Sequence, residues 1–118
     1  MVAEECQIVF DHIRSGDTNF YHLFALVVMP DHVHMLAKPI GDISLERMMQ
    51  GTKGVTARLV NKHRKTQGPL WLGESYDRII RDEIEAIEKQ NYIYENPVRA
   101  GLVKRAPDYP FVYRGALW

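Results

Sequence analysis

Several features that define whole classes of protein are scarce in this sequence. It has one cysteine, Cys6, so no disulfide can form within the chain. Its formal net charge is zero, with 15 basic and 15 acidic residues, which gives no overall attraction for a nucleic acid. Its longest apolar run, LFALVVM at residues 23 to 29, is far shorter than the roughly 18 to 20 residues that cross a bilayer. The sequence therefore predicts no disulfide framework and no membrane span.

The size and composition are those of one soluble domain. A chain of 118 residues with 46% hydrophobic and 25% charged residues is ordinary for a globular protein, and we expect residues 1–118 to form a single domain. The start, MVAEECQIVF, lacks the basic residues and long apolar stretch of a signal peptide, so the sequence predicts a cytoplasmic protein. Cys6 recurs with Val9 and Ile13 at helical spacing, which predicts a small core residue.

The first half of the chain alternates helix and strand signals. Residues 3 to 14 have an amphipathic helical pattern, and residues 20 to 29 are rich in aromatic and β-branched types, as in a strand. Pro30-Asp31 supplies a turn, and the alternation of residues 32 to 38 predicts the second strand of a hairpin. Ser44 is a candidate N-cap for a second helix.

The second half predicts one more strand and one more helix. YDRIIRD at residues 76 to 82 has strand composition, and Asp82 with Glu85 resembles a capping box. The helix that starts there is expected to run to about Asn96, because Pro97 disfavours the α conformation of the residue before it. The proline-rich tail, residues 105 to 118, is expected to lie irregularly across the core. Together these elements predict an α+β fold.

The positive charge is concentrated in one segment. No acidic residue lies between Glu46 and Glu74, whereas six lysines and arginines fall between residues 47 and 65. Such a block can attract phosphates through counterion release, and it can equally be the solvated face of a helix.

Two pairs of residues have a spacing that could support catalysis. His32 and His34 lie two apart on a predicted strand, so both imidazoles project from one face and could bind one metal ion or form a hydrogen-bonded pair. Tyr92 and Asn96 are four apart and share a face if the helix continues between them. Tyrosine can supply a nucleophilic oxygen and asparagine a carbonyl ligand. The same spacing would also arise if Tyr92 were an aromatic that covers the edge of the core and Asn96 capped the helix.

Three longer segments resemble one known family. VVMPDHVHMLAKP at 27 to 39, LWLGESYDRIIRDE at 70 to 83 and NYIYENPVRAGLV at 91 to 103 are similar, in order and spacing, to the REP-associated tyrosine transposases. This family belongs to the single-tyrosine branch of the HUH endonucleases. The resemblance extends over nearly the whole chain from about residue 20 onward.

The resemblance implies a fold, a reaction and a set of site residues. It implies an antiparallel sheet flanked by helices, with the histidines on a central strand, and a magnesium or manganese ion held by His32, His34 and Asn96. It also implies that Tyr92 attacks a phosphodiester of single-stranded, hairpin-forming DNA, leaving a 5′-phosphotyrosine and a free 3′-hydroxyl. Basic side chains around this site are expected to follow the DNA backbone. They are Lys53, Arg58, Lys62, Arg78, Arg81 and Arg99.

One departure from the family pattern leaves alternatives open. Family members usually begin with a strand that resembles FVTFRL, whereas this chain starts directly with the predicted helix. We expect a homodimer that completes the sheet by sharing strands, in preference to a monomer whose tail fills the gap. The alternative function is an inactive, truncated transposase remnant that only binds DNA.

Overall fold

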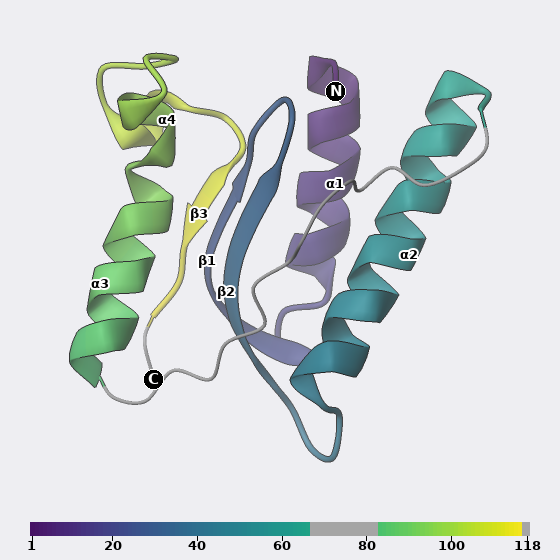
Figure 1. The fold of residues 1–118 in the computed structure, drawn as a ribbon, viewed down its shortest axis with the longest axis horizontal. Coiled ribbons are helices and arrows are strands. Elements are labelled where there is room, and N and C mark those ends of the chain that lie inside the picture. The colour runs from purple at the N-terminus through teal and green to yellow at the C-terminus, as the bar shows by residue number, and fades with distance from the viewer. Residues whose placement is uncertain (67–82, 117–118) are drawn as a thin grey trace.

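The strand β1 (Tyr21–Val28) lies at the centre of the fold, in a computed structural model that describes residues 1–66 and 83–116. All of its residues except His22 are buried, because helices cover both faces of the sheet (Figure 1). Two further strands, β2 (Val33–Pro39) and β3 (Val112–Arg114), pair with it antiparallel in the order β2-β1-β3. The predicted α+β fold, an antiparallel sheet flanked by helices, is confirmed.

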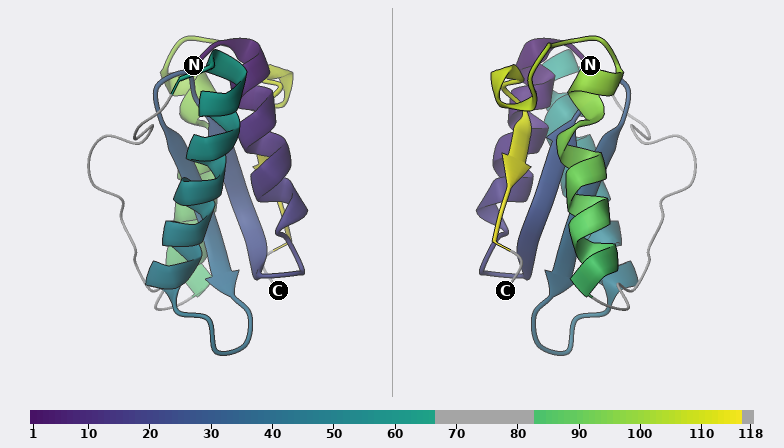
Figure 2. Two further views of the ribbon diagram at one scale, coloured as in Figure 1. Left: turned by 90° about the vertical axis from the view of Figure 1, so that its right-hand side faces the viewer. Right: turned by 90° about the vertical axis from the view of Figure 1, so that its left-hand side faces the viewer.

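The helices form two outer layers. One face of the sheet is covered by α1 (Ala3–Ser15) and α2 (Leu45–Arg64), and the other by α3 (Glu83–Tyr94), as the side views in Figure 2 show. The hairpin turn between β1 and β2 lies at the same end of the molecule as the last turn of α3 (Figure 1). The strand predicted at residues 76 to 82 and the helix start at Asp82 lie outside the described residues.

The first two helices confirm their predictions. Cys6, Val9 and Ile13 form the buried face of α1, so the cysteine is a core residue. The Ser44 side chain caps α2 by accepting a hydrogen bond of 3.1 Å from the Arg47 backbone N–H. The helix tolerates two internal glycines because its buried face packs against the core.

A buried ion pair joins α1 to α2. The Glu5 carboxylate is 3% exposed and accepts hydrogen bonds from the Arg64 guanidinium at 2.7 and 2.9 Å. The Val2 backbone N–H donates to the same carboxylate at 3.0 Å. The hydrogen bonds from Arg64 lower the pKa of Glu5 to about 2, against the opposing effect of burial. Glu5 is therefore ionised across the physiological range.

The C-terminal tail is more regular than the sequence predicted. Val112–Arg114 forms β3 on the free side of β1, and the Tyr109 hydroxyl donates a 2.6 Å hydrogen bond to the Val28 carbonyl. The buried Gln90 of α3 donates to the carbonyls of Phe24 and Gly115, at 3.0 and 2.6 Å, and so fixes this strand against the helix. The prediction of an irregular tail is wrong for residues 112–114, because the unpaired backbone edge of β1 pairs with them.

The position of the histidine strand also differs from the expectation. In the described part of the chain, β2 pairs with β1 alone, so it is an edge strand of three and β1 is central. β1 is central because β3 pairs with its second edge.

The last helix ends earlier than predicted. The chain leaves α3 after Tyr94, turns at Glu95, and starts the short helix α4 (Asn96–Arg99). Pro97 has no N–H to continue the hydrogen-bond ladder of α3, but it is tolerated in the first turn of a new helix. Asn96 therefore belongs to α4 and is not in the final turn of α3. A short 3-10 helix, Ala106–Asp108, leads from there into β3.

Candidate active site

The two histidines stand side by side at the turn between β1 and β2. The Met29 backbone N–H donates to the His32 carbonyl at 2.8 Å and closes the turn, and His34 follows as the second residue of β2. Their ring centroids are 4.8 Å apart with an angle of 77° between the planes. His32 stands in the turn just before β2 and only His34 lies in the strand, and the two imidazoles lie together as the sequence predicted.

Tyr92 reaches the same place from a distant part of the sequence. It lies in the last turn of α3, which packs on the sheet, and its ring centroid is 6.5 Å from that of His34 at an angle of 81°. Tyr92 is 54% exposed, which is high for a large aromatic residue. A histidine pair and an exposed tyrosine thus meet at one end of the molecule, where the hairpin turn and the end of α3 lie together (Figure 1).

Arg99 lies directly against Tyr92. Its guanidinium carbon is 3.9 Å from the centroid of the tyrosine ring, which is a cation–π arrangement. A guanidinium N–H also donates to the backbone carbonyl of Tyr92. The short helix α4 brings Arg99 back over the last turn of α3.

Neighbouring groups contact His32 and affect the charge of His34. Nδ1–H of His32 donates a 2.6 Å hydrogen bond to the Asp31 carboxylate, and this hydrogen bond lowers the pKa of Asp31. Burial lowers the pKa of His34, and repulsion by His32 and Arg99 lowers it further. His34 is therefore favoured as a neutral imidazole, the form that can donate a lone pair to a metal ion.

The ring separation of the histidine pair is compatible with a shared metal ion, and it is equally that of an ordinary edge-to-face pair of aromatic rings. Two imidazoles bound to one ion at right angles, with nitrogen–metal bonds of about 2.1 Å, would place their ring centres roughly 4.6 Å apart. The observed separation is 4.8 Å. The Nδ1 contact with Asp31 leaves Nε2 of His32 as the ring nitrogen that could bind a metal ion, and metal-binding histidines commonly hold a carboxylate on their other nitrogen in this way.

The two histidines would need a further ligand of another kind. Within residues 1–66 and 83–116, no cluster of three or more His, Cys, Asp or Glu side chains could hold a metal ion. An amide, a water or a phosphate oxygen would complete the shell. The half-buried Asn96, in α4, stays the predicted third ligand.

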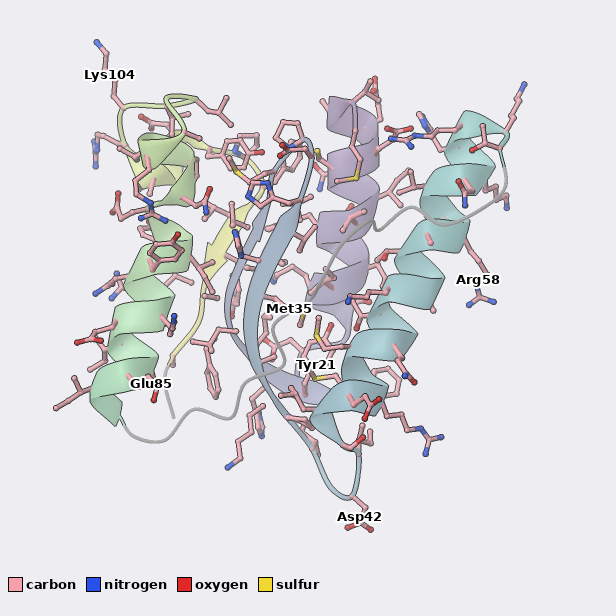
Figure 3. The ribbon with its side chains drawn as sticks, in the orientation of Figure 1. Tyr21, Met35, Asp42, Arg58, Glu85 and Lys104 are labelled. Atoms are coloured by element: carbon pink, nitrogen blue, oxygen red, sulfur yellow. The ribbon has the colours of Figure 1, made fainter. Side chains whose placement is uncertain are left out.

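The predicted DNA-binding residues fall into three groups. Arg99 is at the site, while Arg78 and Arg81 lie outside the described residues. The other three, Lys53, Arg58 and Lys62, are on α2, which covers the opposite face of the sheet from α3 (Figure 2). Figure 3 shows Arg58 pointing away from the sheet. Of the six, only Arg99 is brought beside Tyr92 in the part of the chain that the structure describes.

The sequence did not predict two contacts beside the site, that of Asp31 with His32 and that of Arg99 with Tyr92. Asp31 could have been suspected as the partner of His32, because an adjacent carboxylate often orients a metal-binding histidine. Arg99 was predicted to contact DNA, and nothing in the sequence indicated its contact with Tyr92. That contact depends on the turn at Glu95, which follows the end of α3 at Tyr94, two residues before the helix end that the sequence predicted at about Asn96.

Comparison with known proteins places the chain in a family. The family described as "Transposase IS200 like" matches residues 2–96. A REP-associated tyrosine transposase of Escherichia coli (strain K12) is 30% identical over 93 residues, which cover 77% of this chain and 53% of the relative. A Haemophilus influenzae protein, provisionally named as another REP-associated tyrosine transposase, is 27% identical over 101 residues, which cover 77% of this chain and 57% of the relative.

The chain thus spans a little over half the length of the curated relatives that it matches. No solved structure matches it. None of the helices in residues 1–66 and 83–116 is long and apolar enough to cross a membrane. On the family match over most of its length, the chain belongs to the IS200-like transposase family.

Proposed function

We propose that this chain is a transposase that cuts and rejoins single-stranded DNA through a covalent bond to Tyr92. The observation that carries the proposal is the contact between Tyr92 and His34, at a ring separation of 6.5 Å. It joins a candidate nucleophile on α3 to a candidate metal pair at the start of β2. The names of the two relatives, both tyrosine transposases, support the same class of reaction.

The proposed reaction exchanges one phosphoester bond for another. The Tyr92 oxygen attacks the phosphorus, its proton is lost, and the DNA 3′-oxygen leaves and takes up a proton. The products are a 5′-phosphotyrosine and a free 3′-hydroxyl. Attack by a 3′-hydroxyl on the phosphotyrosine reverses the step and joins the strands, and because the covalent link conserves the phosphoester, rejoining needs no nucleotide cofactor.

A divalent ion is part of the proposal. A tyrosine hydroxyl, with an ordinary pKa of about 10, is a weak nucleophile at neutral pH, so the phosphate must be activated. His32, His34 and Asn96 would hold magnesium or manganese, which withdraws charge from the phosphate and stabilises the leaving oxygen. Asp31 orients the His32 ring, and the neutral state of His34 keeps its lone pair available.

The substrate and the assembly complete the proposal. We expect hairpin-forming single strands, with basic side chains following the DNA backbone. We also expect a homodimer. Sedimentation that shows only 13.7 kDa particles at high protein concentration would contradict the dimer.

The test is a covalent adduct. The protein is incubated with fluorescent single-stranded hairpin DNA and manganese and is then run on a denaturing gel beside Tyr92→Phe and the control Tyr94→Phe. We expect an adduct with the wild type and with Tyr94→Phe, but none with Tyr92→Phe or with a chelator. DNA binding without any adduct would favour the inactive remnant. Cleavage that survives in Tyr92→Phe would favour a hydrolase with a water nucleophile.

A further inference from the structure

One side chain of α4 holds two parts of the same tyrosine. The Arg99 guanidinium covers the ring of Tyr92 at 3.9 Å, and one of its N–H groups donates to the Tyr92 backbone carbonyl. The planar fork of arginine can serve both contacts at once, whereas a lysine ammonium is a single point of charge. Ring and backbone of Tyr92 are thus restrained together.

This double contact depends on the break between the helices. In a continuous helix, a residue seven positions after Tyr92 would lie about 10 Å further along the axis. The turn at Glu95 and the buried Pro97 interrupt this helix, and the Arg99 side chain of α4 reaches Tyr92 in α3. Gly101, with a φ of +75°, then directs the chain away in a left-handed conformation that glycine adopts without strain. The backbone therefore presents Arg99 to the end of α3.

Tyr92 has few other restraints. Its side chain is 54% exposed, and its other ring contact among the described residues is the edge of His34, at 6.5 Å. In residues 1–66 and 83–116, no hydrogen bond fixes its hydroxyl. An exposed tyrosine rotates rapidly between rotamers, and a displacement of about 1 Å at a reacting atom can cost about a hundredfold in rate. Without the guanidinium, the attacking oxygen would visit many positions.

We propose that Arg99 is the positioning residue of Tyr92, holding the ring beside His34 before DNA binds. The inference rests on the proposed function of Tyr92 as the nucleophile. It differs from the role that the sequence suggested for Arg99, a contact to the DNA backbone. A backbone contact would act on DNA affinity, whereas a positioning residue acts on the rate of attack once DNA is bound.

The first test uses the free protein, without DNA or metal. Tyrosine rings are labelled with ¹³C, and the Tyr92 signal is assigned by its loss in Tyr92→Phe. We expect Arg99→Gln to move this signal to the position of an exposed, freely rotating tyrosine, and Arg99→Lys to move it part of the way. The matched control is Lys104→Gln, which removes one positive charge from a side chain that points away from the sheet (Figure 3) and should leave the signal in place.

The second test measures attack at saturating DNA. We expect Arg99→Gln to slow adduct formation about three- to tenfold, from loss of an exposed cation–π contact and a charge-assisted hydrogen bond, with a DNA affinity like that of Lys104→Gln. Backbone amide spectra that match the wild type show that each variant is folded.

Two results would overturn the proposal. One is a Tyr92 ring signal that stays in place in folded Arg99→Gln. The other is an unchanged rate at saturation combined with weaker DNA binding than in Lys104→Gln. Because the NMR test needs no reaction, an absence of adducts in the wild type would refute the proposed function and still leave the contact between Arg99 and Tyr92 testable.

Discussion

Replacement of Glu5 by glutamine should destabilise the protein at neutral pH and leave it nearly unaffected in acid. The carboxylate is buried and joined to Arg64 by two hydrogen bonds, which lower its pKa from 4.5 to about 2. A shift of that size corresponds to about 3 kcal/mol of free energy of unfolding. The Arg64 side chain is 37% exposed, so water screens part of the interaction, and we expect a loss of about 2 kcal/mol in Glu5→Gln at pH 7.

The pH dependence follows from the direction of the shift. A carboxyl group with a lowered pKa in the folded state stabilises the protein fully above the pKa of the unfolded state, 4.5, and this contribution is lost as the pH falls toward about 2. Urea unfolding of wild type and Glu5→Gln is therefore compared at several pH values between 7 and 2. The two free energies of unfolding should converge in acid.

A matched control separates this ion pair from general charge effects. Glu4, the exposed neighbour of Glu5 in the first turn of α1, loses the same charge in Glu4→Gln, and we expect a change below about 0.5 kcal/mol. A difference between wild type and Glu5→Gln that stays constant from pH 7 to pH 2 would refute the reasoning, since it would show that packing and not ionisation of Glu5 is responsible.

Two further predictions concern the metal pair and the backbone. Replacement of Asp31 by alanine should weaken manganese binding about 10- to 100-fold, because the His32 ring loses the partner that orients it; isothermal titration measures this, and an unchanged affinity would show that Asp31 has no such role. Replacement of Gly115 by alanine should lower the free energy of unfolding by about 1 to 3 kcal/mol, because a Cβ there would lie 2.4 Å from the Leu23 carbonyl oxygen. Its counterpart is Gly51→Ala within α2, where the new Cβ would meet no atom within 4 Å apart from its own helix backbone. This change should instead stabilise the protein by about 1 kcal/mol. Changes of the same sign in the free energy of unfolding for the two variants, measured in urea, would contradict this.

The parts of the fold that depend on local signals could be predicted from the sequence. The Ser44 cap and the helical spacing of Cys6, Val9 and Ile13 act within a few residues, and both helices form where these signals lie. The strand β3 was missed because its three residues stand in a tail rich in proline and glycine. What makes it a strand is the unpaired edge of β1, more than 80 residues earlier.

In the site, too, the features set by local sequence could be predicted and those set by distant contacts could not. The proximity of the two histidines was predicted from the period of a strand, although β2 begins at Val33 and His32 lies in the turn before it. The approach of Tyr92 to His34 depends on how α3 packs on the sheet, for which only the family resemblance gave an indication. The contact of Arg99 with Tyr92 depends on the exact residue at which a helix ends, the least predictable feature of a helix.

The most direct test of the central claim is to locate the DNA on the protein. The adduct is digested with nuclease and trypsin, and the peptide from Gln90 to Arg99, which contains both Tyr92 and Tyr94, is fragmented in a mass spectrometer. We predict a nucleotide phosphate on Tyr92, whose ring contacts His34, and none on Tyr94, which lies near Arg114. A phosphate on Tyr94, or an adduct that maps to another peptide, would contradict the account.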